Sequence, residues 1–248
     1  MNLKGKTAIV TGGGRDIGRA CVMALAEAGA NVAINYHSSA EGAESAVAEI
    51  TAKGGKAFAM KGDMTNPDDV NALVDRAASE LGGVDILVNN TGGLIGRKSI
   101  LEMDLDHWQK VMDLNLTSIF HAVKAAVPRM KNGGAIVNIA SQAGRDGGGP
   151  GAAAYATSKG AVITLTRALA KELGPDIRVN SINPGMIDTD FHNIFTKDAV
   201  RTAVANATPL KREGRPEEVG DLVAYLASDK ASFMTGASVD LNGGTVFS

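Results

Sequence analysis

Residues 7–18 read TAIVTGGGRDIG, a short β-branched run that ends in glycines and leads into a segment with helical periodicity. The apolar residues Ile17, Cys21, Leu25 and Ala28 continue that spacing. The order strand, glycine turn, helix begins a βαβ unit, and in that context the backbone can approach a pyrophosphate at a helix N-terminus. The alternative is that the glycines only allow a tight turn and close helix packing.

Strand and helix signals alternate along the rest of the chain. The expected strands are residues 7–11, 31–35, 56–60, 85–89, 135–139, 177–182 and 237–241. The main expected helices are residues 17–29, 43–50, 66–81, 104–129, 153–173 and 216–227. Because parallel neighbours need crossover connections, this order predicts an α/β fold. We expect residues 1–248 to form a single doubly wound Rossmann-type domain, with a seven-stranded parallel sheet covered by helices on both faces.

The composition excludes several classes of protein. Lys and Arg number 25 against 27 Asp and Glu, a net charge of −2, so the sequence offers no basic face for nucleic acid. The longest uncharged stretches, 28–40 and 132–144, are shorter than the roughly 20 apolar residues that span a bilayer. Cys21 is the single cysteine, and no signal-like hydrophobic region precedes the first strand. We therefore expect a cytoplasmic protein with neither nucleic acid nor membrane as a partner.

Tyr155 and Lys159 lie four residues apart on an Ala-rich predicted helix, which places them on one face. An unperturbed tyrosine has a pKa of roughly 10, and a nearby ammonium group favours the phenolate. Such a pair can also occur on a solvated helix face, but Tyr155 is the only tyrosine of the chain with a lysine at this spacing. Ser141 follows the strand 135–139, at a carboxyl end where ligands bind in open α/β sheets.

Several motifs together resemble, in chain order, the signature series of the short-chain dehydrogenases/reductases. They are residues 11–18, Asn89-Asn90-Thr91-Gly92, Asn115, Ser141, Tyr155-Ala156-Thr157-Ser158-Lys159 and Asn183-Pro184-Gly185. The resemblance covers the whole chain. Within the family it is greatest to the 3-oxoacyl-[acyl-carrier-protein] reductases and related bacterial carbonyl reductases.

The resemblance implies four catalytic residues. Tyr155 would be the general acid in reduction and the general base in oxidation, and Ser141 would hydrogen-bond the substrate oxygen. Lys159 would lower the phenol pKa and hold the cofactor ribose. Asn115 would anchor a water that relays protons to Lys159; the alternative is a polar side chain satisfied within its helix.

The same resemblance implies a cofactor site built from the glycine turn and from the segments that follow later strands. Its residues are Gly12, Gly14, Arg15, Asp16, Ile17, Gly18, Asn35, Tyr36, His37, Ser38, Asp63, Met64, Asn89, Thr91, Gly92, Tyr155, Lys159, Pro184, Gly185, Ile187 and Thr189. Asp63 would receive the adenine amino group or simply form a turn. Asn89 would line the cleft with Gly92, or else stabilise the sheet. Ile187 and Thr189 would hydrogen-bond the nicotinamide amide.

Asp16 departs from the family pattern, because a glycine usually stands at this position. It immediately precedes the expected helix, so we predict that its carboxylate caps the free N–H groups there and keeps its charge away from the phosphates.

The end of the second strand bears on the choice of cofactor. NAD sites of this architecture usually place an acid there, about 20 residues beyond the glycine turn, whereas the first acid here is Glu41 in the next expected helix. Arg15 can supply a cation on the adenosine side, so NADP(H) should be preferred over NAD(H). The alternative is that Arg15 only pairs with Asp16 or solvent and that Ser38 and the backbone decide.

Residues 188–212 have weaker periodicity and are predicted to form a mobile lid on the substrate side. Within them, the alternating Asp188, Asp190 and His192 do not complete a metal ligand set, so no metal is expected. The loop 144–151 forms either one wall of the substrate pocket or a flexible surface loop. No Gly-x-Ser-x-Gly elbow of a serine hydrolase follows any strand.

The expected reaction is the NADPH-dependent reduction of a carbonyl in a 3-oxoacyl thioester or related ketone. The alternatives are an NAD(P)-dependent sugar or polyol dehydrogenase and, outside enzymes, a nucleotide-sensing regulator on the same fold. The substrate would be a small molecule or an acyl thioester, with an acyl carrier protein as a candidate partner. Arg129, Lys131 and Lys171 are candidate docking charges for that acidic carrier, or only solvated surface residues. A homotetramer is expected from the family resemblance.

Overall fold

The computed structural model describes residues 1–247, without the side chains of Lys131 and Asn132. Within these residues one sheet of seven parallel strands has the order β3-β2-β1-β4-β5-β6-β7. The strands are β1 (Thr7–Val10), β2 (Asn31–Tyr36), β3 (Ala57–Lys61), β4 (Val84–Asn89), β5 (Met130–Ile139), β6 (Ile177–Pro184) and β7 (Ser238–Leu241). The predicted doubly wound α/β fold is therefore confirmed.

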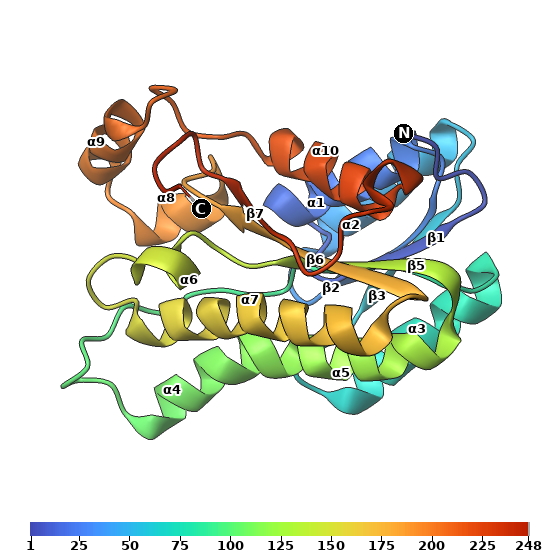
Figure 1. Cartoon of the computed structure of the whole chain (residues 1–248), viewed down its shortest axis with the longest axis horizontal. Helices are drawn as coiled ribbons and strands as arrows, with labels where there is room; N and C mark the ends of the chain where they lie inside the picture. Colours follow the sequence, from blue (N-terminus) through green and yellow to red (C-terminus); the bar gives the residue numbers. More distant parts are fainter. Residues whose placement is uncertain (248) are drawn as a thin grey trace.

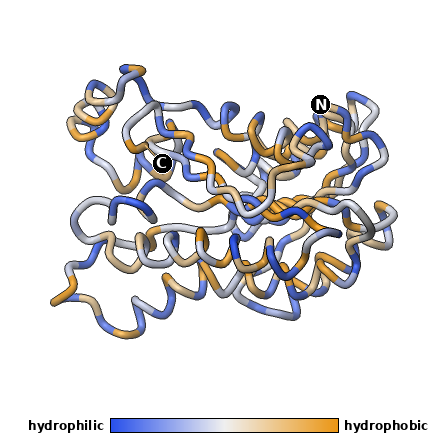
Figure 2. The backbone as a smooth tube through the Cα atoms, viewed as in Figure 1, coloured by the Kyte–Doolittle hydropathy of each residue, from blue (hydrophilic) through white to orange (hydrophobic). Residues whose placement is uncertain are grey.

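Helices cover both faces of the sheet (Figure 1). One face carries α1 (Asp16–Glu27), α2 (Ala40–Ala52) and α10 (Pro216–Ala227), and the other carries α3 (Pro67–Leu81), α4 (Leu105–Met112), α5 (Ser118–Ala126) and α7 (Ala153–Leu173). Each face buries its own apolar core, and Figure 2 shows the hydrophobic residues concentrated along the central strands between them. Strands buried on both sides explain the nearly continuous apolar runs in the sequence.

The boundaries of α3 follow from its sequence. The Asn66 side chain accepts the N–H of Asp68 at 3.0 Å, Pro67 occupies the first turn, and Gly82 ends the helix with a left-handed φ of 90°. The cap, the first-turn proline and the terminal glycine can all be identified from the sequence.

The single helix expected over 104–129 is interrupted. A π-helical turn (Asp113–Thr117) separates α4 from α5, and a 3₁₀ turn (Val127–Arg129) leads into β5, which begins earlier than expected. At this turn the Asn115 side chain donates to the carbonyl of Val111, four residues back, at 2.9 Å. A side chain that takes a helix carbonyl disturbs the regular ladder, and such π turns recur at functional sites.

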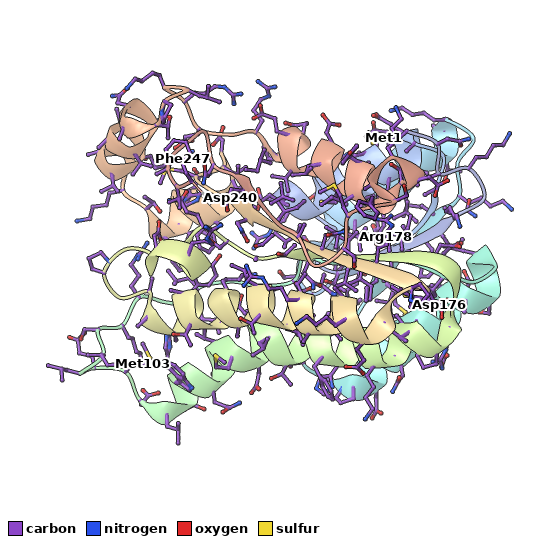
Figure 3. The ribbon with its side chains drawn as sticks, viewed as in Figure 1. Met1, Met103, Asp176, Arg178, Asp240 and Phe247 are labelled. Atoms are coloured by element: carbon purple, nitrogen blue, oxygen red, sulfur yellow. The ribbon has the colours of Figure 1, made fainter. Side chains whose placement is uncertain are left out.

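Residues 188–212 contain two helices that the periodicity did not reveal, α8 (Asp190–Phe195) and α9 (Asp198–Ala207). A further short helix, α6 (Ala143–Asp146), and a 3₁₀ turn (Asp229–Ala231) complete the elements. Helices this short repeat an apolar pattern too few times to be recognised. In Figure 3, Asp240 of β7 marks the carboxyl end of the sheet, beside α8, and Arg178 near the start of β6 marks the other end.

Candidate active site

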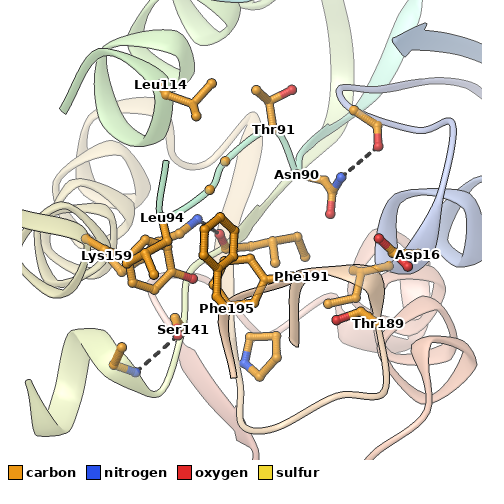
Figure 4. A pocket seen from close by; sticks show the side chains of 18 of the residues that line it. Asp16, Asn90, Thr91, Leu94, Leu114, Ser141, Lys159, Thr189, Phe191 and Phe195 are labelled. Atoms are coloured by element: carbon orange, nitrogen blue, oxygen red, sulfur yellow. Dashed lines mark hydrogen bonds between the residues drawn. The ribbon is translucent and has the colours of Figure 1, made fainter. Parts of the chain in front are cut away.

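A cavity of about 880 Å³ lies at the carboxyl ends of the strands and extends to α8 (Figure 4). Most of the predicted site residues line it: Gly12, Arg15, Asp16, Ile17, Gly18, Asn35, His37, Ser38, Asp63, Met64, Thr91, Gly92, Ser141, Tyr155, Lys159, Pro184, Gly185, Ile187 and Thr189. The segments that follow β1 to β6 thus meet at one edge of the sheet, as ligand sites of this architecture do.

The three residues expected to carry the chemistry lie together. Lys159 and Tyr155 stand on one face of α7, with the Lys159 Nζ 5.8 Å from the centre of the Tyr155 ring. Lys159 is 3% exposed and donates to the carbonyl of Ile139, the last residue of β5, at 2.8 Å. The Ser141 hydroxyl, two residues further on, accepts the N–H of Ala143 at 3.1 Å (Figure 4). Strand β5 therefore positions both Ser141 and Lys159.

Burial sets the protonation of this group. Desolvation raises the pKa of Tyr155 above its usual value, and a hydrogen bond with Ser141 acts in the opposite direction. Desolvation also lowers the pKa of Lys159 to about 8. Burial outweighs the lowering of the phenol pKa by its neighbours, and the expected contribution of Lys159 to that lowering stays a prediction. Ser141 is the neighbour that lowers the phenol pKa, and the Lys159 ammonium is itself destabilised by burial.

In the glycine turn, neighbouring segments of the backbone approach one another closely. Gly12 has a φ of 63°, and its N–H donates to the Asn35 side chain at 3.0 Å. A Cβ on Gly18 would lie 2.1 Å from the Gly12 carbonyl oxygen, so α1 packs directly on the turn. Asn90, which sequence reasoning left unassigned, donates from its side chain to the carbonyls of Thr11 and Gly12 at 3.1 and 3.0 Å. Its place directly after a buried strand was the signal that could have identified it.

Two features of the cavity wall fit a bound dinucleotide. The Thr91 hydroxyl is buried, borders the cavity and has no hydrogen-bond partner among the described residues. A Cβ on Gly92 would lie 2.7 Å from the Asn115 Oδ1 and 3.0 Å from the Lys159 Nζ, so only a glycine leaves room between them. With the free N–H groups at the start of α1, these features suit a ligand that carries a pyrophosphate and hydroxyl groups.

Gly14, Tyr36 and Asn89 were expected at the cofactor but do not line the cavity. A Cβ on Gly14 would lie 2.3 Å from the Ser39 Oγ, so this glycine serves packing against the start of α2. Tyr36 packs at the edge of the core that contains α1 and α2. Asn89 is 2% exposed and donates to the Asn138 side chain at 2.8 Å, which ties β4 to β5. This bond fits the alternative of sheet stabilisation, and a contact of Asn89 with the cofactor stays a prediction.

Asn115 also lies off the cavity, fully buried in the π turn. Besides its bond to Val111, its amide donates to the Gly93 carbonyl at 2.8 Å and accepts the Gly93 N–H at 2.9 Å. The side chain is thus a satisfied polar group that holds the Gly92-Gly93 segment against Lys159. Its role in a proton relay stays a prediction.

The predicted cap on α1 is wrong. Asp16 has a φ of 50°, and its Oδ1 accepts the backbone N–H of Asp190, at the start of α8, at 3.1 Å. Arg15 lies between the two acids, with its Nε 3.9 Å from Asp16 and its Nη1 3.9 Å from Asp190. Burial raises the pKa of Asp16, and the hydrogen bond from Asp190 partly counters this.

Asp63, His37 and Ser38 line the part of the cavity that is expected to receive adenosine. Asp63 accepts hydrogen bonds at 2.8 Å from both the N–H and the hydroxyl of Thr65, and the backbone bond is the main reason that its pKa is lowered. Asp63 therefore forms a turn and also lines the cavity, while its contact with adenine stays a prediction.

An apolar wall faces Tyr155 on the substrate side, and sequence reasoning missed it. The Phe191 ring of α8 lies 5.9 Å from the Tyr155 ring and 5.2 Å from the Phe195 ring. Leu94 lies near these rings, and Leu114 borders the cavity nearer Thr91 (Figure 4). The Phe191 and Phe195 spacing of four residues was the available signal.

Arg97 joins three segments around the same wall. It donates to the carbonyl of Phe195 at 3.2 Å and to that of Pro150 at 2.9 Å. Gly148 and Gly149 line the cavity, so the loop 144–151 forms a pocket wall. No group of three or more His, Cys, Asp or Glu residues suited to a metal occurs within residues 1–247. In the same part of the chain, no helix has the length and apolar character needed to cross a membrane.

The sequence matches a family model described as Enoyl-(Acyl carrier protein) reductase over residues 12–246. It is 40% identical, over 243 residues, to the 3-oxoacyl-[acyl-carrier-protein] reductase FabG of Staphylococcus aureus, a match that covers 96% of this chain and 97% of the relative.

Solved structures share the fold at similar identity. A short-chain dehydrogenase/reductase from Serratia marcescens superposes with a TM-score of 0.93 at 38% identity, covering 98% of this chain and 99% of the other. A blue fluorescent protein from a metagenomic library, in complex with NADPH, gives a TM-score of 0.93 at 38% identity and covers both chains completely. These matches confirm the resemblance that the motifs indicated: the chain belongs to the short-chain dehydrogenase/reductase family and is an NAD(P)-dependent oxidoreductase.

Proposed function

We propose that this protein reduces the carbonyl of a 3-oxoacyl thioester or related ketone to a hydroxyl, with NADPH as cofactor and Tyr155 as proton donor. The grouping of Tyr155, Ser141 and Lys159 at the wall of one cavity carries the proposal. The 3-oxoacyl reductases among the relatives support the substrate class. When bound, the nicotinamide would supply a hydride to the carbonyl carbon.

The protonation of the site suits reduction. The pKa of Tyr155 is raised by burial, so at neutral pH the phenol holds a proton that it can donate to the developing alkoxide. The Ser141 hydroxyl, which hydrogen-bonds with Tyr155, would also hydrogen-bond the same substrate oxygen. Lys159, with a pKa of about 8, is still mostly charged at neutral pH and stabilises the phenolate that forms.

The preference for NADPH rests on the charges around the adenosine end. No acid stands at the end of β2, and Arg15, His37 and Ser38 all line the cavity. Arg15 is about half exposed, and its two ion pairs at 3.9 Å are of the weak surface kind that a phosphate can displace. A solved structure of the same fold that is in complex with NADPH supports the preference.

The remaining assignments are a lid formed by residues 188–212, a homotetramer, a cytoplasmic location and docking of an acyl carrier protein. The aromatic wall on α8 supports the lid, and the single, buried and unpaired Cys21 suits a reducing compartment. Of the candidate docking charges, Arg129 pairs with Asp75, Lys171 is exposed, and the side chain of Lys131 lies outside the described residues.

A panel of carbonyls and alcohols with both nicotinamide cofactors tests the proposal. The 3-oxoacyl reductases among the relatives lead us to expect that an acetoacetyl thioester is reduced faster than an unactivated ketone. The Tyr155→Phe variant is the control for turnover at this site. Efficient oxidation of sugars without reaction of any thioester would instead indicate a polyol dehydrogenase. Cofactor binding without any turnover would indicate a nucleotide-sensing regulator.

A further inference from the structure

The lid helix α8 starts on a residue of the cofactor turn. Asp16 and Asp190 are 174 residues apart, yet the Asp16 carboxylate accepts the backbone N–H of Asp190, one of the first-turn N–H groups that a helix leaves unpaired. Thr189, at the N-cap position of α8, uses its own hydroxyl to donate to the Ile187 carbonyl at 3.1 Å. The cap of α8 is therefore supplied from a distant part of the chain.

Asp16 adopts a costly conformation to make this contact. Its φ of 50° lies in the left-handed region that residues other than glycine rarely occupy. Its side chain is only 25% exposed, so a carboxylate is partly removed from water. A glycine would remove both costs and would also remove the acceptor.

The start of α8 determines where the apolar wall stands. Phe191 directly follows Asp190, and its ring packs between those of Tyr155 and Phe195. The other attachment of this wall is the bond from Arg97 to the Phe195 carbonyl. Figure 4 shows Asp16 beside Thr189 at one side of the cavity and Phe191 and Phe195 at the other, nearer Lys159.

We propose that Asp16 is a positioning residue for substrate: from within the cofactor turn it caps α8 and so holds Phe191 against Tyr155. The inference rests on the proposed carbonyl reduction. It predicts that a change in the glycine turn alters substrate binding more than cofactor binding, the reverse of what its location in the sequence indicates.

Two variants break the same hydrogen bond from opposite sides. Asp16→Gly removes the acceptor without backbone strain, and Asp190→Pro removes the donor. Proline suits the first position of a helix, and Thr189, with φ −151° and ψ 159°, has the extended backbone required before a proline. Asp16→Asn keeps an oxygen acceptor and tolerates the left-handed backbone, so it is the rescue variant. Asp190→Asn keeps the backbone N–H and is the matched control.

The steady-state result should be a change in KM. We expect Asp16→Gly and Asp190→Pro each to raise KM for the carbonyl substrate about tenfold, with smaller changes in kcat and in the NADPH dissociation constant. The double variant should add little to either one, because both remove one bond. Asp16→Asn and Asp190→Asn should resemble the parent.

Limited proteolysis of the full chain gives a second readout that needs no substrate. Lys197 is exposed at the start of α9, so cleavage after it by trypsin reports the opening of residues 188–212. Asp16→Gly and Asp190→Pro should both be cleaved faster than the parent, with or without NADPH, even if no tested carbonyl proves to be a substrate. Parent-like cleavage and KM in both variants, additive effects in the double variant, or a defect confined to NADPH affinity would each overturn the proposal.

Discussion

The proposed catalytic group of Tyr155, Ser141 and Lys159 and the proposed lid, residues 188–212, form two walls of one cavity, yet they are held in different ways. Lys159 is buried and donates to the end of β5, in the middle of the sheet. The proposed lid is held by charged groups: Arg201, whose side chain is 15% exposed, lies 2.6 Å from Asp188 and 2.5 Å from Glu213. The groups proposed to react stand on a long helix and after an inner strand, whereas the phenylalanines of the proposed substrate wall stand on the short helix α8, which has no buried residue.

This difference separates two kinds of change. A substitution at the catalytic group alters a proton donor or a buried charge, and few local rearrangements can replace either. A substitution in the lid alters contacts that water and neighbouring side chains partly replace. Chemistry and substrate choice are therefore expected to change independently in this molecule.

The largest effect should come from Tyr155→Phe. The change removes the transferable proton but little packing, so we expect turnover to fall by about 10²–10⁴-fold while NADPH affinity stays within a few-fold. Cofactor oxidation followed by absorbance, together with a cofactor titration, measures both. Retention of more than half the activity would show that another group donates the proton. The wall that holds Tyr155 would then not be the one that carries the chemistry.

Lys159→Met should also abolish most turnover and weaken cofactor binding, yet it should stabilise the fold. The lysine pKa is about 8 in the folded protein against a usual 10.5, so the charged form is penalised in the folded state. That penalty is complete below pH 8 and vanishes above pH 10.5. We expect a gain in unfolding free energy of about 1–2 kcal/mol at neutral pH, after loss of the bond to Ile139, that shrinks towards alkaline pH.

Urea unfolding of the parent and the Lys159→Met variant near neutral pH and in the alkaline range measures this gain. A variant that is less stable than the parent at neutral pH would mean that the bond to the Ile139 carbonyl outweighs the cost of burying the ammonium.

The parts of this molecule that sequence could predict are those decided locally. The limits of α3 depend on Asn66, Pro67 and Gly82, which all lie at its own ends. The grouping of Tyr155, Ser141 and Lys159 was predictable because the spacing of Tyr155 and Lys159 on one helix, and the place of Ser141 after a strand, carry the information.

The misses depend on contacts between distant segments. The partner of Asp16 is 174 residues away, so no local cap rule could reveal it. Asn89 and Tyr36 lie next to residues that do line the cavity, but neighbouring side chains of a strand point to opposite faces of the sheet. The break at Asn115 coincides with its side-chain bonds to Val111 and to the distant Gly93, which a helical pattern over 104–129 does not show.

Arg15→Ala should have an intermediate effect, at the boundary between the two regions. If Arg15 contacts the 2′-phosphate, its removal should cost about tenfold or more in kcat/KM for NADPH and little for NADH. Kinetics with both cofactors in the parent and the variant measure the preference. An unchanged preference would leave Arg15 as a partner of Asp16 and Asp190 only, and a parent that favours NADH would overturn the cofactor assignment.

The smallest effect should come from Phe191→Leu, which keeps an apolar side chain but removes the ring that packs 5.9 Å from Tyr155. Aromatic pairs contribute about 0.5–1.5 kcal/mol beyond the area they bury, so we expect KM for an acyl thioester to rise about two- to tenfold. Because Phe191 belongs to neither apolar core, the unfolding transition should not move. If kcat falls while KM stays constant, the lid acts on the proton donor itself. Chemistry and substrate choice would then not change independently, and the contrast between the two walls would be wrong.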